Sequence, residues 1–228
     1  MKIIAKIHTD FPEKFGIPRQ SGLVDALRAA IVFEPPYRNA DALRGIDGFS
    51  HLWLIWKFSE TEQETWSPTV RPPRLGGNTR MGVFATRSPF RPNPIALSSV
   101  KLCGVDWQTP LGPVLHVAGA DLMDGTPIYD IKPYLAFTDS HPDAVGGFSD
   151  GVFGHALQVK LPDALPADMT PEKREALIGV LAEDPRPSYH RDPYRVYTFD
   201  FDKWSVSFSV KDDSLTVSKI VENTALDG

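Results

Sequence analysis

The sequence of 228 residues contains a single cysteine, Cys103, and no long apolar run. One cysteine cannot build an intramolecular disulfide framework, and it fits a reducing compartment. No stretch reaches the roughly 18 apolar residues that a membrane-spanning helix needs. The first residues also lack the apolar core and the cleavage site of a secretion signal. We therefore expect a soluble protein of the cytoplasm.

The motifs of the common nucleotide and metal sites are absent as well. There is no G-x-G-x-x-G to support a Rossmann site and no G-x-x-x-x-G-K-[ST] to support a phosphate loop. The G-x-S-x-G elbow of many hydrolases is missing. The six histidines show no metal-ligand spacing, so we expect no metal. An enzyme with this sequence must use another kind of nucleotide site.

The chain divides into three parts, and its fold class is predicted to be mainly β (α+β). Residues 1–145 hold short apolar runs between prolines and glycines, which predicts a largely antiparallel sheet or barrel. Residues 146–160 are glycine-rich at their start and are predicted to be a linker or loop. Residues 161–228 predict a small α+β domain. Strands are expected at 2–7, 29–33, 52–58, 83–86, 97–102, 114–117, 196–201, 204–210 and 215–221, and helices at 23–30, at 39–43 and from Thr170-Pro171 to Asp184.

A cluster of positive charge interrupts an acidic chain. The net charge of −5 argues mildly against a nucleic-acid partner. Local fields decide binding, however, and residues 65–105 contain no aspartate or glutamate. This cationic segment indicates an anion-binding surface; the alternative is a set of solvated surface arginines. Its basic residues are Arg71, Arg74, Arg80, Arg87, Arg91 and Lys101.

Within it, the loop Arg71–Pro94 is unusually rich in proline and glycine. Prolines fix φ and lower the entropy cost of ordering the loop, and glycines permit close approach of the backbone to a ligand. Arginines add planar forks that pair with carboxylate or phosphate. A stiff backbone with rigid donors predicts a preorganised anion site.

A second motif, Pro18-Arg19-Gln20, has a similar character near the N-terminus. Arg19 offers a fork, and the amide of Gln20 presents both a donor and an acceptor, as an adenine edge requires. A simple turn into the predicted helix at 23–30 explains the motif equally well.

A third motif gathers Asp121, Asp124 and Asp130 around a Gly-Thr-Pro turn. Three roles are open for these carboxylates: structural ion pairs, contacts with ribose hydroxyls, or general-base catalysis. His51 lies in the segment Phe49–Trp56, which has the pattern of a buried strand. It is interpreted as a hydrogen-bonded core residue rather than as a catalytic one.

Together these segments resemble the TrmO (YaeB) family of bacterial transfer-RNA methyltransferases. The resemblance lies in Pro18–Gln20, Phe49–Leu52, Arg71–Pro94, Asp124–Tyr134 and Glu183–Tyr189. It implies a TsaA-like antiparallel β-barrel that binds S-adenosylmethionine (SAM), followed by a small C-terminal domain, in a homodimer. It also implies N6-methylation of N6-threonylcarbamoyladenosine (t6A) at position 37 of a threonine-accepting tRNA, giving m6t6A.

The expected reaction suggests catalytic and tRNA-binding residues, and the resemblance assigns the SAM contacts by position. The candidate catalytic residues for methyl transfer are Arg87, Asn93, Asp121 and Asp124, with Asp121 or Asp124 as the candidate base. The candidate tRNA contacts are Arg71, Arg74, Arg80, Arg91, Arg186 and Arg191. Contacts to SAM are expected at Pro18, Arg19, Gln20, Phe58, Ser59, Arg87, Leu97, Gly119, Ala120, Asp121 and Leu122.

Two other functions remain open. A regulatory module would bind SAM without catalysis, and a different methyltransferase would act on a small adenine-containing metabolite. Methylation of tRNA, with and without its threonylcarbamoyl group, separates all three.

Overall fold

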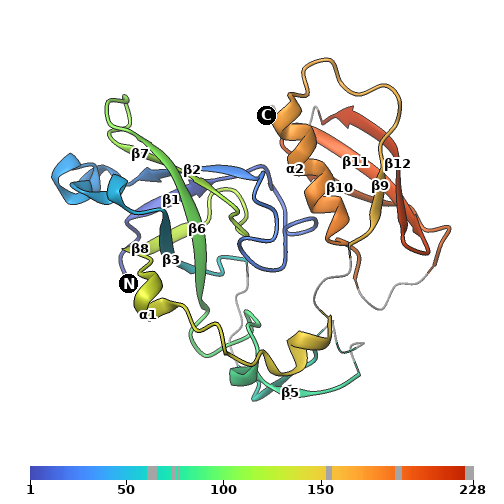
Figure 1. Cartoon of the computed structure of the whole chain (residues 1–228), viewed down its shortest axis with the longest axis horizontal. Coiled ribbons are helices and arrows are strands. Elements are labelled where there is room, and N and C mark those ends of the chain that lie inside the picture. The colour runs from blue at the N-terminus through green and yellow to red at the C-terminus, as the bar shows by residue number, and fades with distance from the viewer. Residues whose placement is uncertain (61–65, 73–74, 76–77, 153–155, 188–191, 224–228) are drawn as a thin grey trace.

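The computed structural model describes residues 1–60, 66–72, 75, 78–152, 156–187 and 192–223, which form a barrel and a second, smaller domain (Figure 1). None of the helices in these ranges has the length and apolar character that crossing a bilayer would require. The predicted fold class, an antiparallel β-barrel followed by a small α+β domain, is confirmed.

Six antiparallel strands close the barrel, so no strand of it is left with an unpaired edge. Side chains along β3 alternate between core and surface, as the two-residue period of a strand requires. Leu52, Leu54 and Trp56 therefore point into the barrel core. In order around the barrel, the strands are β1 (Ala5–His8), β2 (Arg28–Phe33), β7 (Val114–Ala118), β6 (Ile95–Asp106), β3 (His51–Lys57) and β8 (Pro127–Pro133).

The C-terminal domain packs one helix on a four-stranded sheet. The helix α2 (Pro171–Ala182) begins as predicted: the hydroxyl of Thr170 accepts a hydrogen bond from the Lys173 amide at 3.3 Å, and Pro171 occupies the first helical position. The hairpin predicted at Asp202 is also present. The sheet order is β10 (Tyr197–Phe201), β11 (Trp204–Lys211), β12 (Ser214–Glu222) and β9 (Gln158–Lys160), with β9 parallel to β12.

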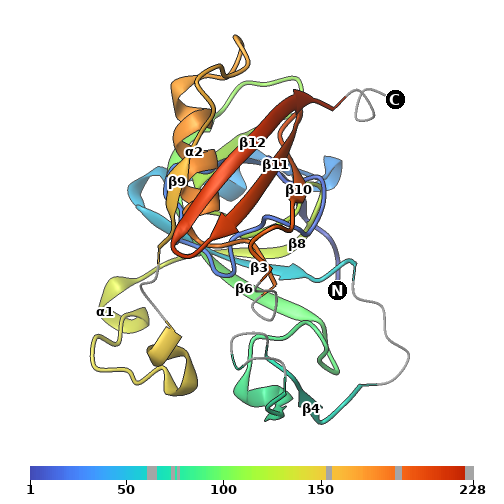
Figure 2. The ribbon, with the colours of Figure 1, turned by 90° about the vertical axis from the view of Figure 1, so that its right-hand side faces the viewer.

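Shorter elements complete the described chain. Figure 2 shows the segment that carries β4 (Thr69–Val70) and β5 (Met81–Gly82) projecting below the barrel, away from the C-terminal sheet. The remaining elements are α1 (Ala136–Asp139) and 3₁₀ helices at Pro35–Tyr37, Ala40–Leu43, Ile46–Gly48, Val83–Ala85 and Gly147–Val152.

Some local predictions were wrong. The helix predicted at 23–30 is a turn followed by β2, because Ala29, Ile31 and Phe33 are needed as inward-facing barrel residues. The strand predicted at 83–86 is a 3₁₀ helix. The barrel strand β8 was not predicted, since two prolines bound it. The helix predicted at 39–43 is 3₁₀, with Asn39 as its cap.

The segment predicted as a linker, residues 146–160, contains regular structure. It holds the 3₁₀ helix Gly147–Val152 and the strand β9, which pairs with β12. The C-terminal sheet therefore begins before residue 161.

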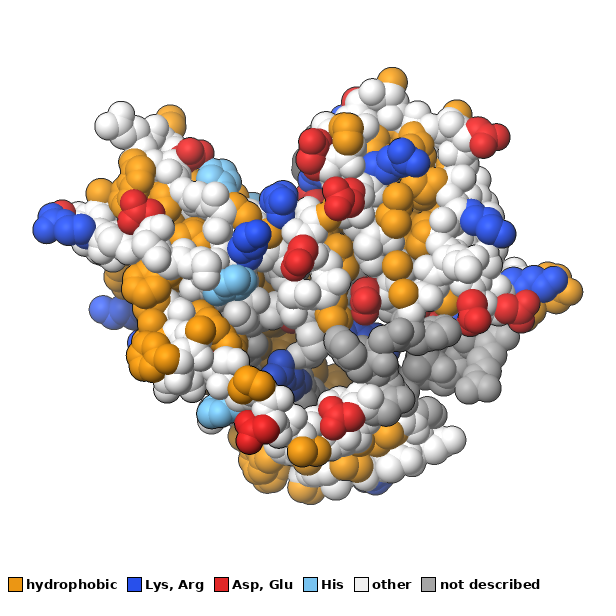
Figure 3. Space-filling view, viewed as in Figure 1, with side chains coloured by type: hydrophobic (Ala, Val, Ile, Leu, Met, Phe, Trp, Pro, Cys, Tyr) orange, Lys and Arg blue, Asp and Glu red, His pale blue; other side chains and the backbone are white. Residues whose placement is uncertain are grey.

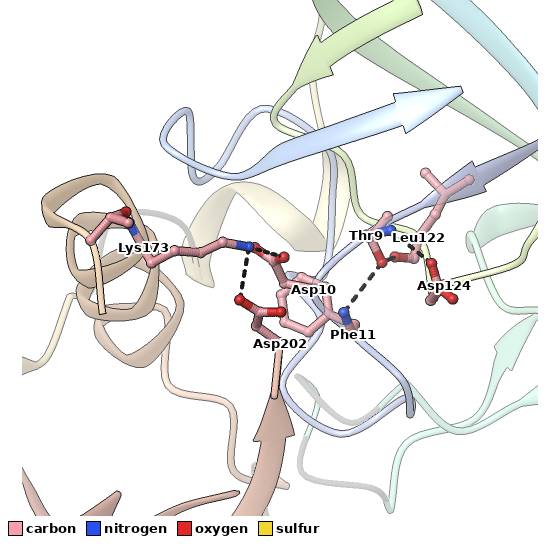
Figure 4. A network of polar contacts seen from close by, with 8 residues as sticks. Thr9, Asp10, Phe11, Leu122, Asp124, Lys173 and Asp202 are labelled. Atoms are coloured by element: carbon pink, nitrogen blue, oxygen red, sulfur yellow. Dashed lines mark hydrogen bonds and ion pairs between the residues drawn. The ribbon is translucent and has the colours of Figure 1, made fainter. Parts of the chain in front are cut away.

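The two domains share the connection between β1 and β2, residues 9–27, which we call the shared loop. At its start, the Lys173 ammonium on α2 pairs with Asp10 and lies 3.3 Å from Asp202 Oδ2 (Figure 4). The Asp202 amide donates to the Asp10 carbonyl at 2.7 Å. Burial raises the pKa of Asp10, and the ion pair with Lys173 opposes that rise.

Figure 3 shows an indentation between the two domains. Basic side chains lie on its barrel side, and acidic side chains lie on the side of the C-terminal domain.

The contact between Gly179 of α2 and Val24 of the shared loop makes a prediction about stability. Alanine favours a helix over glycine by about 1 kcal/mol, but a Cβ at residue 179 would lie 2.5 Å from Val24 Cγ1. Overpacking of that kind costs about 1–3 kcal/mol. We expect Gly179→Ala to lower the free energy of unfolding by about 1 kcal/mol in chemical denaturation.

In a Val24→Ala background the overlapping methyl group is absent, so the new Cβ has room. There, Gly179→Ala should raise the free energy of unfolding instead of lowering it. An equal effect of Gly179→Ala in both backgrounds would contradict the packing of α2 on the shared loop.

Candidate active site

The Pro18–Gly22 part of the shared loop lies across the wall of the barrel. The Gly22 amide donates to the Gly119 carbonyl at 2.9 Å, and the Ser99 amide of β6 donates to Ser21 Oγ at 3.2 Å. Gly22 and Gly119 both have positive φ, and a Cβ on Gly119 would lie 3.3 Å from the Gly22 backbone. Glycine is favoured at residue 119, because its φ is positive and a side chain there would crowd the Gly22 backbone.

Gln20 joins this loop to the cationic segment. The guanidinium of Arg87 donates to Gln20 Oε1, and Gln20 Nε2 donates to the Arg19 carbonyl. Both side-chain ends of Gln20 are thus oriented by neighbours, with Arg87 exposed beside it. Two motifs that are 67 residues apart in the sequence meet in one place.

A buried hydrogen-bond chain places the third motif beside them. Trp56 Nε1 donates to Ser98 Oγ at 2.9 Å, and Ser98 Oγ donates to Asp121 Oδ1 at 2.6 Å. The direction is fixed, because an indole N–H only donates and so leaves the serine hydroxyl to donate onward. Trp56 and Ser98 are buried, and they orient the Asp121 carboxylate.

Burial raises the pKa of Asp121 above its ordinary value of 3.8. The hydrogen bond from Ser98, backbone amides including that of Ser21, and the positive charge of Arg87 lower it in part. A carboxylate with a raised pKa, next to the backbone amide of Ser21 and the guanidinium of Arg87, is typical of ligand-binding and catalytic sites. The site can bind a polar, charged nucleoside and can accept a proton.

Family profiles match both domains. The tRNA-methyltransferase O N-terminal domain matches residues 6–140, and the TrmO C-terminal domain matches residues 154–223. The chain belongs to the tRNA-methyltransferase O family. Both domains match the family, so the C-terminal sheet belongs to a domain that the family describes.

Known members support this assignment along most of the chain. An Escherichia coli K12 protein named tRNA (adenine(37)-N6)-methyltransferase is 43% identical, over 90% of this chain and 92% of its own length. A protein of the same name from Eikenella corrodens is 48% identical over 72% of this chain and 92% of its own length. A crystal structure of TrmO from Pseudomonas aeruginosa superposes with a TM-score of 0.77 at 30% identity, covering 96% of this chain and 95% of that one.

The other residues predicted to contact a cofactor differ in how much of their side chain is exposed to solvent. Leu97 projects from β6 and is 53% exposed, whereas Ala120 and Leu122 are buried in the barrel core. Phe58 packs its ring on Trp56 with centroids 4.6 Å apart. Half-buried Ser59 and buried Pro18 complete the set.

Of the candidate catalytic residues, Asp124 lies elsewhere. Its Oδ1 accepts from the Thr9 amide at 3.0 Å and from His8 Nδ1 at 3.2 Å, at the end of β1 (Figure 4). No hydrogen bond or ion pair among the described residues joins Asp124 to Asp121 or Arg87. Asp124 thus has a structural contact, which leaves Asp121 as the better candidate base. Asn93 is exposed in the loop before β6.

The expected tRNA contacts differ in how much of their side chain they expose. Arg71 and Arg80 are exposed on the β4–β5 segment, where Arg80 Nη1 donates to Thr69 Oγ1 at 3.2 Å. Arg91 instead donates to the Thr86 carbonyl at 2.7 Å, and Arg186 forms a two-pronged pair with Asp184 at 2.8 Å. Both of these guanidinium groups hold their own loops together. Arg74 and Arg191 lie outside the described residues.

Sequence reasoning missed Trp56 and Ser98. Ser98 occupies an inward-facing position of β6, two residues before buried Val100, and a buried hydroxyl needs a partner. That polar residue at a core position was the available signal.

Within the described ranges, no group of three or more histidine, cysteine, aspartate or glutamate side chains is placed to hold a metal ion. His51 is half-buried, and its Nδ1 lies 2.9 Å from Ser50 Oγ.

Because the pKa of Asp121 is raised in the folded protein, we expect the free energy of unfolding to depend on pH. Because folding raises this pKa, the folded state holds the proton more tightly, and stability falls as pH rises from 3.8 through the folded-state value. We expect Asp121→Asn to raise the denaturation midpoint at pH 7 and to lose that gain near pH 3.5. Asp124→Asn, which alters a carboxylate 44% exposed to water, should show no such gain. A midpoint for Asp121→Asn below that of the parent at pH 7 would contradict this.

Proposed function

We propose that this chain transfers the methyl group of SAM to N6 of adenine 37 in tRNA. The observation that carries the proposal is the meeting of Gln20, Arg87 and Asp121 at one point on a non-Rossmann barrel. The relatives named tRNA (adenine(37)-N6)-methyltransferase, from Escherichia coli and Eikenella corrodens, support the reaction. The cytoplasmic location and the homodimer stay predictions.

The residues at this site fit SAM. When bound, SAM supplies a methyl group on a positively charged sulfonium. The oriented amide of Gln20 suits an adenine edge, and the guanidinium of Arg87 suits the cofactor carboxylate. Gly22 and Gly119 themselves place no side chain on this part of the wall.

We further propose that the substrate is t6A37 of a threonine-accepting tRNA and that the product is m6t6A. The N6 atom of t6A lies between a purine and a carbonyl, so it is a weak nucleophile until its proton leaves. Asp121 is the proton acceptor in this proposal, since its raised pKa brings its basicity closer to the task. The exposed guanidinium groups of Arg71 and Arg80 suit the threonyl carboxylate and the anticodon phosphates.

The substrate is tested with tRNA from a strain that lacks this gene, prepared with and without the threonylcarbamoyl group. Radiolabel from SAM should appear only in modified, threonine-accepting tRNA. Binding of SAM with no transfer to any tRNA would instead favour a regulatory module, and labelling of free adenine metabolites alone would favour a small-molecule methyltransferase.

Arg87→Ala should lower kcat/KM in this assay by about 100-fold or more, because misplacing a bound group by about 1 Å costs that much. Arg44→Ala is the matched control, since Arg44 is 80% exposed and pairs only locally with Asp41. Full activity of Arg87→Ala in a folded protein would remove Arg87 from the site.

Ser98→Ala tests Asp121 as the proton acceptor. Activity should fall as pH drops through the Asp121 pKa, on the acid limb of the pH–rate profile. Without the hydrogen bond from Ser98, which lowers this pKa, the limb should move to higher pH. A limb that stays in place in Ser98→Ala would show that another group accepts the proton.

A further inference from the structure

The shared loop carries apolar side chains into the core of the C-terminal domain, although the loop belongs to the barrel in sequence. Phe11, Val24 and Leu27 are 1%, 5% and 3% exposed and are buried with the residues of α2 and the C-terminal sheet. Phe15 and Ile17, just before the Pro18–Gln20 motif, pack against the same core. Both arms of the loop are therefore anchored in the second domain.

The approach to the motif follows the C-terminal sheet closely. The Phe15 ring meets Phe199 edge-on with centroids 6.2 Å apart. Gly16 has φ of +100°, and a Cβ there would overlap the Phe199 ring. The path of the chain into Pro18 is thus set by side chains of β10.

Arg19 makes the last contact before the site. Its Nη2 donates to the main-chain carbonyls of Arg186 at 3.1 Å and Asp184 at 3.4 Å, just after α2. These acceptors are themselves held in place, because the Asp184 carboxylate pairs at 2.8 Å with both Nε and Nη2 of Arg186. Hydrogen bonds to a charged donor are stronger than neutral ones and favour one geometry.

The residue after Arg19 is Gln20, whose amide is fixed by Arg87 and by the Arg19 carbonyl itself. We propose that Arg19 is a positioning residue, through which the segment 184–186 of the C-terminal domain sets the conformation of the loop Gln20–Gly22. In this role, its guanidinium points to the second domain and not to the cofactor. This inference rests on the proposed function, since it assigns Gln20–Gly22 to the SAM site.

The test uses the full-length protein and four variants, Arg19→Ala, Arg19→Lys, Arg186→Ala and the double variant Arg19→Ala/Arg186→Ala. S-adenosylhomocysteine is the probe, and its Kd is measured by calorimetry. Arg19→Ala should weaken binding roughly tenfold, the range expected for loss of a charged hydrogen bond. Arg186→Ala should also weaken binding, and the double variant should be no weaker than Arg19→Ala, because both changes break the same connection.

Amide hydrogen exchange of the ligand-free protein gives a second readout that needs neither cofactor nor activity. Protection of the amides at residues 20–22 should fall in Arg19→Ala and Arg186→Ala. Arg19→Lys should recover part of both effects, since an ammonium keeps the charge but loses the planar fork. Arg174→Ala is the control, because this exposed arginine lies on α2 away from the segment 184–186.

The outcomes are separable. If Arg19→Ala binds weakly while Arg186→Ala binds and exchanges like the parent, Arg19 acts on the ligand directly and the inference is overturned. If the parent protein binds no S-adenosylhomocysteine, the proposed function fails, and unchanged exchange at residues 20–22 in the variants still decides against the positioning role. Melting temperatures close to that of the parent show that each variant is folded.

Discussion

The burial of Phe11, Val24 and Leu27 in the C-terminal core is the contact on which the rest of the site depends. These residues belong to the connection between two barrel strands, yet their apolar surface is covered by the second domain. Because the intervening chain then passes along β10 and α2, these contacts set the path by which Pro18–Gly22 reaches the barrel wall. The second domain is thus part of the framework that holds Pro18–Gly22.

The site buries a carboxylate, which destabilises its charged form. The Asp121 carboxylate is partly desolvated, and its neighbours Ser98 and Arg87 only partly offset the resulting rise of its pKa. Asp10 carries a similar burial cost beside Lys173, but there the ion pair joins the two domains. One buried acid therefore serves the architecture, and the other is available for chemistry.

The sequence predicted the barrel strands β1, β2, β3, β6 and β7 from short apolar runs. It also predicted the α2 start and, from two-residue alternation, the C-terminal hairpin, because these signals are local. The helix predicted at 23–30, which overlaps the strand predicted at 29–33, is instead a turn that leads into β2, because Ala29, Ile31 and Phe33 face the barrel core. Composition and family resemblance singled out Gln20, Arg87 and Asp121, which the fold brings close together. The buried chain from Trp56 through Ser98, and the structural use of Arg91, Arg186 and Asp124, depend on contacts between distant segments and were not predictable from spacing.

We propose that three distant motifs form one SAM site whose loop is held by the C-terminal domain. A crystal structure with bound S-adenosylhomocysteine is the decisive measurement. We expect the ligand to contact Gln20, Arg87 and Asp121, with the Arg19 guanidinium still on the carbonyls of residues 184 and 186. A ligand bound elsewhere, or an Arg19 side chain that leaves those carbonyls to contact it, would rule out this arrangement.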